Sequence, residues 1–118
     1  MQQEKRYDLE DRTLAFAKTV RAFVKALSKS ISNQEDARQV VRASGSVGAN
    51  YIEANEALSK KDFLLRLKIC RKEAKESRYW LRLLDTGTDA GLQKDRDNLI
   101  QEATELMNIF GSIIRKTE

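Results

Sequence analysis

The chain has 118 residues, with no proline, no histidine and a single cysteine, Cys70. It carries 22 basic and 18 acidic residues, for a formal net charge of +4, and 41% of its residues are hydrophobic. This length suits one domain. The composition excludes an intramolecular disulfide, a Cys/His zinc site and a catalytic triad with a histidine base. We therefore expect a protein that is not an enzyme, needs no cofactor and functions through its surface and its assembly.

The first residues of the sequence do not predict a signal peptide. Its first ten residues are polar and lack an apolar run of signal-peptide length. No window approaches the roughly 20 consecutive apolar residues that a membrane span requires. A single thiol is compatible with a reducing compartment. We expect a cytoplasmic protein without a membrane partner.

Apolar and small residues recur at alternating steps of three and four, the period of an amphipathic α-helix. Each of four segments has seven such positions, and Arg96 is their one charged member. These core-facing positions are Leu9, Thr13, Phe16, Val20, Phe23, Leu27, Ser30; Ala37, Val40, Ser44, Val47, Tyr51, Ala54, Leu58; Phe63, Leu67, Cys70, Ala74, Ser77, Leu81, Leu84; and Leu92, Arg96, Leu99, Ala103, Leu106, Phe110, Ile113. The pattern predicts one domain over 1–118, with helices at roughly 8–30, 34–58, 60–85 and 91–116.

Capping residues predict where these helices begin and end. Ser32 and Ser59 are each followed three residues later by an acid, the spacing of a capping box. Gly87 lies in the third break and suits a helix C-terminus. Because the connections are short, consecutive helices become antiparallel neighbours. The expected fold class is all-α, an antiparallel up-down-up-down four-helix bundle.

Apolar residues outside the core-facing positions need a second explanation. In the first and fourth segments we expect them to widen the core face: Ala17, Val24, Ile31, Ile100, Met107 and Ile114. The third segment has a further set, which we name the apolar patch: Leu65, Ile69, Tyr79, Trp80 and Leu83. Surplus apolar surface with aromatic residues indicates contact with another subunit or protein. The alternative is a wide core face with Trp80 tucked between helices.

Small residues cluster in the middle of the second segment, at Ala43–Asn50. Two of them, Gly45 and Gly48, would each cost about 1 kcal/mol relative to alanine inside a helix. We expect close approach of another helix to account for them, with Ala74 and Ser77 of the third segment as the matching small residues. The alternative, a Gly-x-x-Gly clamp on nucleic acid, requires a loop.

Basic residues concentrate in the third segment, where 60–84 contain nine basic and three acidic residues. Seven of them form one outward row, which we name the basic stripe: Lys61, Lys68, Arg71, Lys72, Lys75, Arg78 and Arg82. Such a row is the electrostatic footprint expected of a surface for the phosphate backbone of RNA or DNA. Two alternatives remain. The basic stripe could be a solvated face, or it could pair across an interface with the acidic second and fourth segments.

Three Glu-x-x-Glu pairs raise an alternative, in which the protein is an enzyme. They are Glu53/Glu56, Glu73/Glu76 and Glu102/Glu105. Carboxylate pairs can hold magnesium inside helical bundles, as in all-α nucleoside-triphosphate pyrophosphohydrolases. Glu56 and Glu76 lie opposite the core-facing positions of their helices. We therefore expect these glutamates to lie on a solvated surface and to pair with nearby lysines rather than to hold a metal.

The second and third segments contain a combination of motifs that resembles a known family. Ser46, Asn50 and Glu53 form Ser-x-x-x-Asn-x-x-Glu, followed by Lys-Asp-Phe at 61–63 and Glu-Ser-x-Tyr-Trp-Leu at 76–81. With these motifs the chain, from about Leu9 to Ile114, resembles the four-helix bundle family, also named the 23S ribosomal RNA intervening-sequence protein family.

The resemblance implies a left-handed antiparallel bundle that assembles into a homopentamer without established catalytic activity. Members are encoded inside inserted segments of bacterial ribosomal RNA genes. A similar bundle, the accessory variability determinant of diversity-generating retroelements, is a basic pentamer that contacts nucleic acid and a reverse transcriptase. We thus expect a homo-oligomer, with RNA, DNA or another protein as candidate partners. Many members have proline where this chain has Gly48, so we expect its second helix to run straight.

Overall fold

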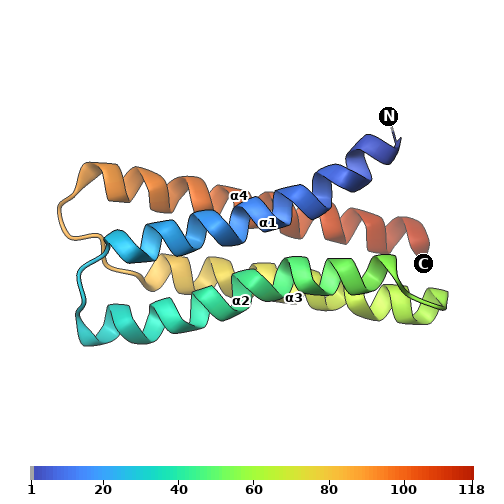
Figure 1. Ribbon diagram of the computed structural model, residues 1–118, viewed down its shortest axis with the longest axis horizontal. Helices are drawn as coiled ribbons and strands as arrows, with labels where there is room; N and C mark the ends of the chain where they lie inside the picture. The colour runs from blue at the N-terminus through green and yellow to red at the C-terminus, as the bar shows by residue number, and fades with distance from the viewer. Residues whose placement is uncertain (1) are drawn as a thin grey trace.

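Four α-helices run up and down along one axis (Figure 1). The computed structural model describes residues 2–118, with side chains from Leu9 onward. The helices are α1 (Gln2–Ala26), α2 (Ile31–Asn55), α3 (Lys60–Leu83) and α4 (Ala90–Thr117), and they fill an envelope of 46 × 27 × 19 Å. α1 and α3 each pack against both α2 and α4. The predicted all-α, up-down-up-down bundle is confirmed.

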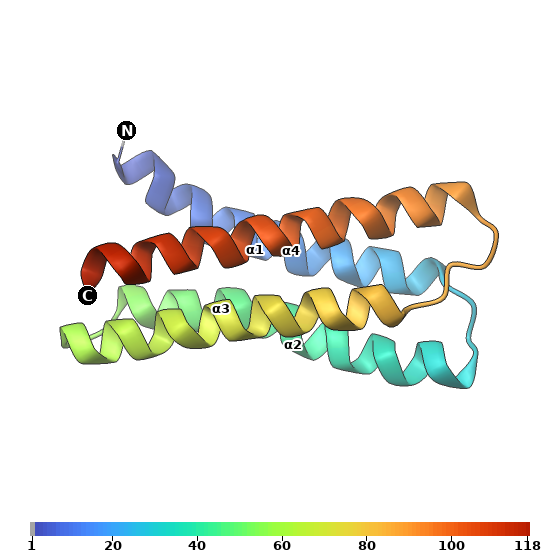
Figure 2. The same ribbon diagram turned by 180° about the vertical axis from the view of Figure 1, so that it is seen from behind.

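The two ends of the bundle differ. Both chain ends lie at one of them, where the first turns of α1 diverge from α4 (Figures 1 and 2). The connections from α1 to α2 and from α3 to α4 lie at the other end. Within the described part of the chain, no helix combines the length and apolar character needed to cross a membrane.

The helix starts are set by hydroxyl and carboxylate caps, and one predicted cap is wrong. Ser30, not Ser32, is the N-cap of α2, because its Oγ accepts the backbone N–H of Asn33 at 3.2 Å. α1 therefore ends at Ala26, before the predicted 30, and α2 begins earlier than predicted. The prediction for Ser59 is confirmed, since its Oγ accepts the N–H of Asp62 at 3.1 Å.

Gly87 does not end α3, which stops at Leu83. It lies instead in the following turn, where its φ of 61° favours glycine. Its N–H donates to Oδ1 of Asp85 at 2.8 Å. Asp89 then starts α4 by accepting the N–H of Leu92 at 3.0 Å. This connection is thus a structured turn between two caps.

All four helices contribute their core-facing positions to one apolar core. Its largest fully buried side chains include Phe110, Leu67, Leu81, Leu84, Leu106, Val20, Val40 and Val47. Three core-facing positions are exceptions. Ser30 is a cap, and Leu58 follows α2, which ends at Asn55 rather than 58. Arg96 is half-buried outside the apolar core, and its Nη1 donates to the carbonyl of Leu84 at 3.1 Å. Ile31 is 84% exposed in the first turn of α2, so the expectation that it widens the core face is wrong.

The glycines of α2 face α1, not α3 as expected. A Cβ on Gly48 would stand 2.9 Å from Oγ1 and 3.2 Å from Cβ of Thr13. A Cβ on Gly45 would contact only the guanidinium of Arg21, at 3.4 Å. Ala74 and Ser77 are buried in the core instead. α2 continues through Gly48 as a helix, in keeping with the absence of proline.

Asn33 joins the two connections at the end of the bundle that is remote from the chain ends. It is 2% exposed. Its Nδ2 donates to the carbonyl and Oγ of Ser28 and, at 3.0 Å, to the carbonyl of Asp85. Its Oδ1 accepts the N–H of Asp85 at 2.9 Å. One side chain therefore joins the backbone of Ser28 to that of Asp85, which lies 52 residues after Asn33.

Candidate functional site

The basic stripe runs along the outer side of α3, toward α4. Six of its seven members are exposed, and Arg78 is half-buried. Nη1 of Arg78 donates to Oγ1 of Thr104 on α4 at 3.3 Å. Nζ of Lys68 lies 3.4 Å from a carboxylate oxygen of Glu118. The side chains of Lys61, Lys72, Lys75 and Arg82 form no ion pair with any side chain from Leu9 onward, so their charges face solvent.

Most of the apolar patch lies beside the basic stripe, toward α2, whereas Tyr79 shares a row with Lys72, seven residues before it. Ile69 and Trp80 belong to the same row of α3 as Glu73, four residues before it and seven residues after it, and Glu73 contacts α2 through Arg42. Leu65, Tyr79 and Leu83 are each about half exposed, at 54%, 58% and 48%. Apolar side chains that remain in water on one helix are available for contact with another molecule.

Trp80 differs from the rest of the apolar patch because it packs against the core. Its ring also meets Tyr79 edge-on, with centroids 5.1 Å apart. Its Nε1 is buried and finds no hydrogen-bond partner among the described residues. Trp80 is thus tucked against the core, as the alternative interpretation expected, and its contact with another subunit stays a prediction.

Two members of the Ser-x-x-x-Asn-x-x-Glu motif act together, and an arginine joins them. Nδ2 of Asn50 donates to the carbonyl and Oγ of Ser46 at 2.9 and 3.0 Å. Oδ1 of Asn50 accepts Nη1 of Arg66 at 3.0 Å. Glu53 is exposed on the next turn. The motif thus ties α2 to α3 through Arg66, which sequence reasoning did not single out.

Two of the three Glu-x-x-Glu pairs form ion pairs with arginines, and the third is exposed. Nε and Nη2 of Arg12, on α1, donate to the two carboxylate oxygens of Glu102 at 2.7 and 2.8 Å. Nη2 also donates to Oε1 of Glu105 at 2.7 Å. These contacts, chiefly the hydrogen bond to Glu102, raise the pKa of Arg12. Hydrogen bonds from Gln101 and then Arg12 lower the pKa of Glu105.

The second pair is engaged in the same way. Arg42 lies 3.6 Å from Glu73 and 3.4 Å from Glu76, whereas Glu53 and Glu56 are exposed. Among the side chains that the structure describes, no three histidine, cysteine, aspartate or glutamate residues come together to hold a metal. The glutamates of two pairs thus join helices through arginines, whereas the expected partners were nearby lysines.

Cys70 is a core residue rather than a reactive thiol. It is buried, and its Sγ donates to the carbonyl of Val47 at 3.4 Å. Burial raises its pKa to about 12. A thiol with such a pKa is protonated at neutral pH and is a poor nucleophile.

The four-helix architecture and the motif on α2 and α3 agree with a comparison against protein families. The family described as 23S rRNA-intervening sequence protein matches residues 5–112. The chain belongs to this family. The match covers all of α2 and α3, and with them both surfaces described above.

Among solved structures, this intervening-sequence protein is similar to a protein of unknown function from the S23 ribosomal protein family of Bacteroides thetaiotaomicron. The two share 32% sequence identity and superpose with a TM-score of 0.78. The similarity covers 94% of this chain and 98% of the other. No curated protein matches the sequence.

Sequence reasoning about this family member missed the residues that join its helices. Arg12, Asn33 and Arg66 each contact residues 16 to 93 positions away, which no local pattern can reveal. Only Arg12 had a partial signal, because the spacing of Glu102 and Glu105 places two carboxylates on one helix face.

Proposed function

We propose that the protein is a non-catalytic homo-oligomeric scaffold that presents α3 to nucleic acid. Its subunits associate through the apolar patch, in a pentameric ring of the kind that the family resemblance implies. The basic stripe contacts the phosphate backbone of RNA or DNA. The observation that carries the proposal is the pairing of these two surfaces, side by side on one helix.

Exposure of the apolar patch supports assembly. Leu65, Tyr79 and Leu83 lie on the outer side of α3, and about half of each remains exposed to water. Burying them between subunits would remove apolar surface from water, which favours association. Tyrosine and tryptophan are also enriched at protein interfaces, whereas lysine is depleted. The neighbouring lysines therefore fit the rim of such an interface better than its centre.

The basic stripe supports contact with nucleic acid. Six of its seven cations, all except Lys68, have no carboxylate within 4.0 Å among side chains from Leu9 onward. A ring repeats the stripe on every subunit, so weak phosphate contacts add through avidity. Point charges recognise the backbone rather than the bases, so binding is weakly sequence-specific.

Assembly is tested by light scattering coupled to gel filtration. Tyr79→Ser with Leu83→Ser should reduce the mass of the particle while the helical circular dichroism signal is kept. Leu14→Ser with Ile52→Ser is the matched control, because these side chains are similarly exposed on α1 and α2, at 54% and 51%. A monomeric wild type, or equal loss of mass in both variants, contradicts the proposed interface.

Nucleic-acid contact is tested by filter binding of a structured RNA and a DNA duplex across a salt series. Reversal of Lys68, Lys75 and Arg82 to glutamate should abolish retention. The control reverses Lys25, Lys94 and Lys116, which changes the net charge equally on other helices. Wild-type affinity should fall steeply with salt, by about 0.7 to 0.9 in log K per log unit of salt for each phosphate neutralised. No retention by wild type at low salt contradicts nucleic-acid binding.

A further inference from the structure

The guanidinium of Arg66 is oriented by a hydrogen bond, but no carboxylate neutralises its charge. One of its five N–H groups donates to Asn50. Among side chains from Leu9 onward, no carboxylate lies within 4.0 Å of its guanidinium. Arg12 and Arg42, by contrast, are each held by two glutamates. Arg66 is also half-buried, so water compensates its charge only in part.

Asn50 can hold Arg66 in one direction because its own amide is fixed. Both contacts from its Nδ2 go to Ser46, one turn earlier on α2. Its Oδ1 is thereby turned toward α3, where it accepts Arg66. An amide acceptor orients the guanidinium without cancelling its charge, whereas an aspartate at this position would do both. The remaining N–H groups of Arg66 stay available to an anion.

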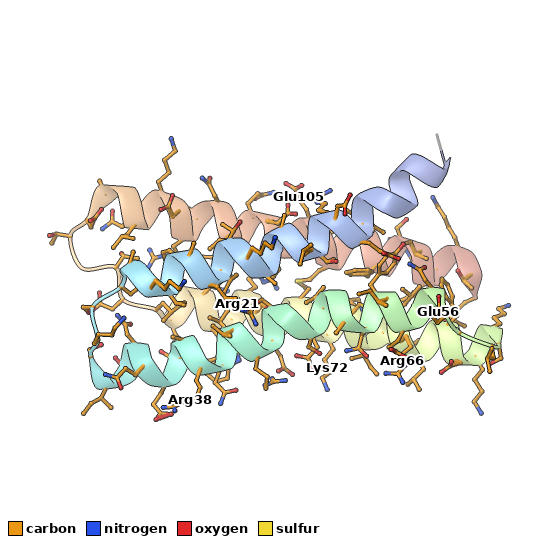
Figure 3. The ribbon with its side chains drawn as sticks, in the orientation of Figure 1. Arg21, Arg38, Glu56, Arg66, Lys72 and Glu105 are labelled. Atoms are coloured by element: carbon orange, nitrogen blue, oxygen red, sulfur yellow. The ribbon has the colours of Figure 1, made fainter. Side chains whose placement is uncertain are left out.

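The surroundings of Arg66 fit an extended anion. Figure 3 places Arg38, Arg66 and Lys72 along the same edge of the molecule, formed by α2 and α3. Lys72 is six residues from Arg66, about 9 Å along the helix, and is exposed without a carboxylate partner from Leu9 onward. A planar guanidinium matches two oxygens of a phosphate group, and Lys72, farther along α3 and about a third of a turn around it, supplies a point charge for another phosphate of the same strand.

We propose that Arg66, oriented by Asn50 and Ser46, is a phosphate-binding site that contacts the nucleic-acid backbone, with Lys72 engaging the adjoining stretch. This inference rests on the proposed function, because it adds a directional contact to the point charges of the basic stripe. It also gives the Ser-x-x-x-Asn part of the motif a role: the two residues position an arginine on the neighbouring helix.

Asn50→Asp is the sharpest variant, since it keeps Arg66 and adds a carboxylate that neutralises it. It should lower RNA affinity about tenfold, as Arg66→Ala should, because a hydrogen bond to a charged group is lost in both. Arg66→Lys keeps the charge, so its salt dependence should stay close to wild type while affinity falls about threefold. Glu53→Gln is the control on the same face and should not weaken binding.

A second measurement separates this site from the proposed function. The Nε–Hε resonance of Arg66, assigned with Arg66→Lys, should shift saturably when inorganic pyrophosphate is added, and should not shift in Asn50→Asp. If RNA is not retained but this shift occurs, the phosphate site stands and the proposed function fails. If RNA is retained equally by wild type, Arg66→Ala and Arg66→Lys, the site is overturned while the proposed function stands. Absence of both the shift and RNA retention overturns both.

Discussion

At the scale of single residues, the space beside a side chain decides what a substitution does. Gly48 and Gly45 lie one turn apart in α2 and both face α1, yet their neighbours differ. A Cβ on Gly48 would press on the stem of Thr13, whereas a Cβ on Gly45 would meet the end of a flexible arginine. The two glycines therefore have opposite expected responses to alanine.

Gly48→Ala should destabilise the fold by about 1 to 3 kcal/mol through overpacking, despite its better helix propensity. Gly45→Ala should stabilise it by up to about 1 kcal/mol, because propensity improves and Arg21 can move. Urea unfolding monitored by circular dichroism measures both changes. Adding Thr13→Ala to Gly48→Ala should recover part of the loss. Equal effects of the two alanines would show that Thr13 does not limit the packing.

Cys70 gives a prediction for alkaline pH. Its pKa is about 12 in the fold, against an ordinary value of 9.0. Below pH 9 the thiol is protonated in both the folded and the unfolded state. Above pH 9 it ionises only in the unfolded state, so its contribution to stability is lost as pH rises from 9 toward 12. Wild type should therefore lose more stability over this window than Cys70→Ala, measured by urea unfolding at each pH. Parallel curves would contradict a raised pKa.

At the scale of helices and connections, a few polar side chains hold the apolar elements in register. Arg12 joins α1 to α4, Arg42 and Arg66 join α2 to α3, and Asn33 joins two connections. The ion pairs are partly exposed, so each contributes modestly. Asn33 is different, because its partners are backbone groups that would be left without a hydrogen bond at a buried site.

Asn33→Ala should cost about 3 kcal/mol, since it leaves backbone groups of Ser28 and Asp85 without partners. Hydrogen exchange should rise first in the connections at that end of the bundle. Asn98→Ala, on the exposed side of α4, is the control and should change stability by less than about 0.5 kcal/mol. A loss as small as that of the control would mean that the two connections are held together by other contacts.

The periodicity of the sequence was sufficient to predict the helices and their buried faces, but not which neighbour each flank meets. The flank of α2 that carries Gly48 turns to α1 rather than α3, and this choice depends on the direction in which the helices follow one another around the bundle. That direction does not alter the pattern along any one helix. Ser32 with Glu35 matches the local pattern of a capping box, whereas the cap in the structure is Ser30, and the third residue after it, Asn33, contacts a distant connection.

For the candidate site, too, the sequence could predict some features and not others. The exposure of the basic stripe and of half the apolar patch follows from positions on one helix, so the sequence could predict it. Burial of Trp80 against the core, and the Asn50–Arg66 contact, depend on how closely α2 and α3 approach. Such contacts require the packed structure.

At the scale of the whole molecule, assembly would make stability depend on concentration. If subunits associate through α3, the thermal midpoint should rise with protein concentration, because the oligomer binds only folded chains. Tyr79→Ser with Leu83→Ser should remove this dependence while Leu14→Ser with Ile52→Ser should keep it. Differential scanning calorimetry over a hundredfold concentration range makes the comparison. A midpoint that does not change with concentration in wild type would count against the assembly.

The unlike ends of the bundle make the chain a natural substrate for circular permutation. The start of α1 and the end of α4 lie at the same end of the bundle as the connection from α2 to α3, where Leu58 is 98% exposed (Figures 1 and 2). A short linker could join the ends, and new ends could open between Ala57 and Leu58 without breaking a helix. Cutting at the opposite end would separate the backbone groups that Asn33 ties together. The connection from α2 to α3 could thus be opened without loss of the fold, whereas the connections at the opposite end must stay intact.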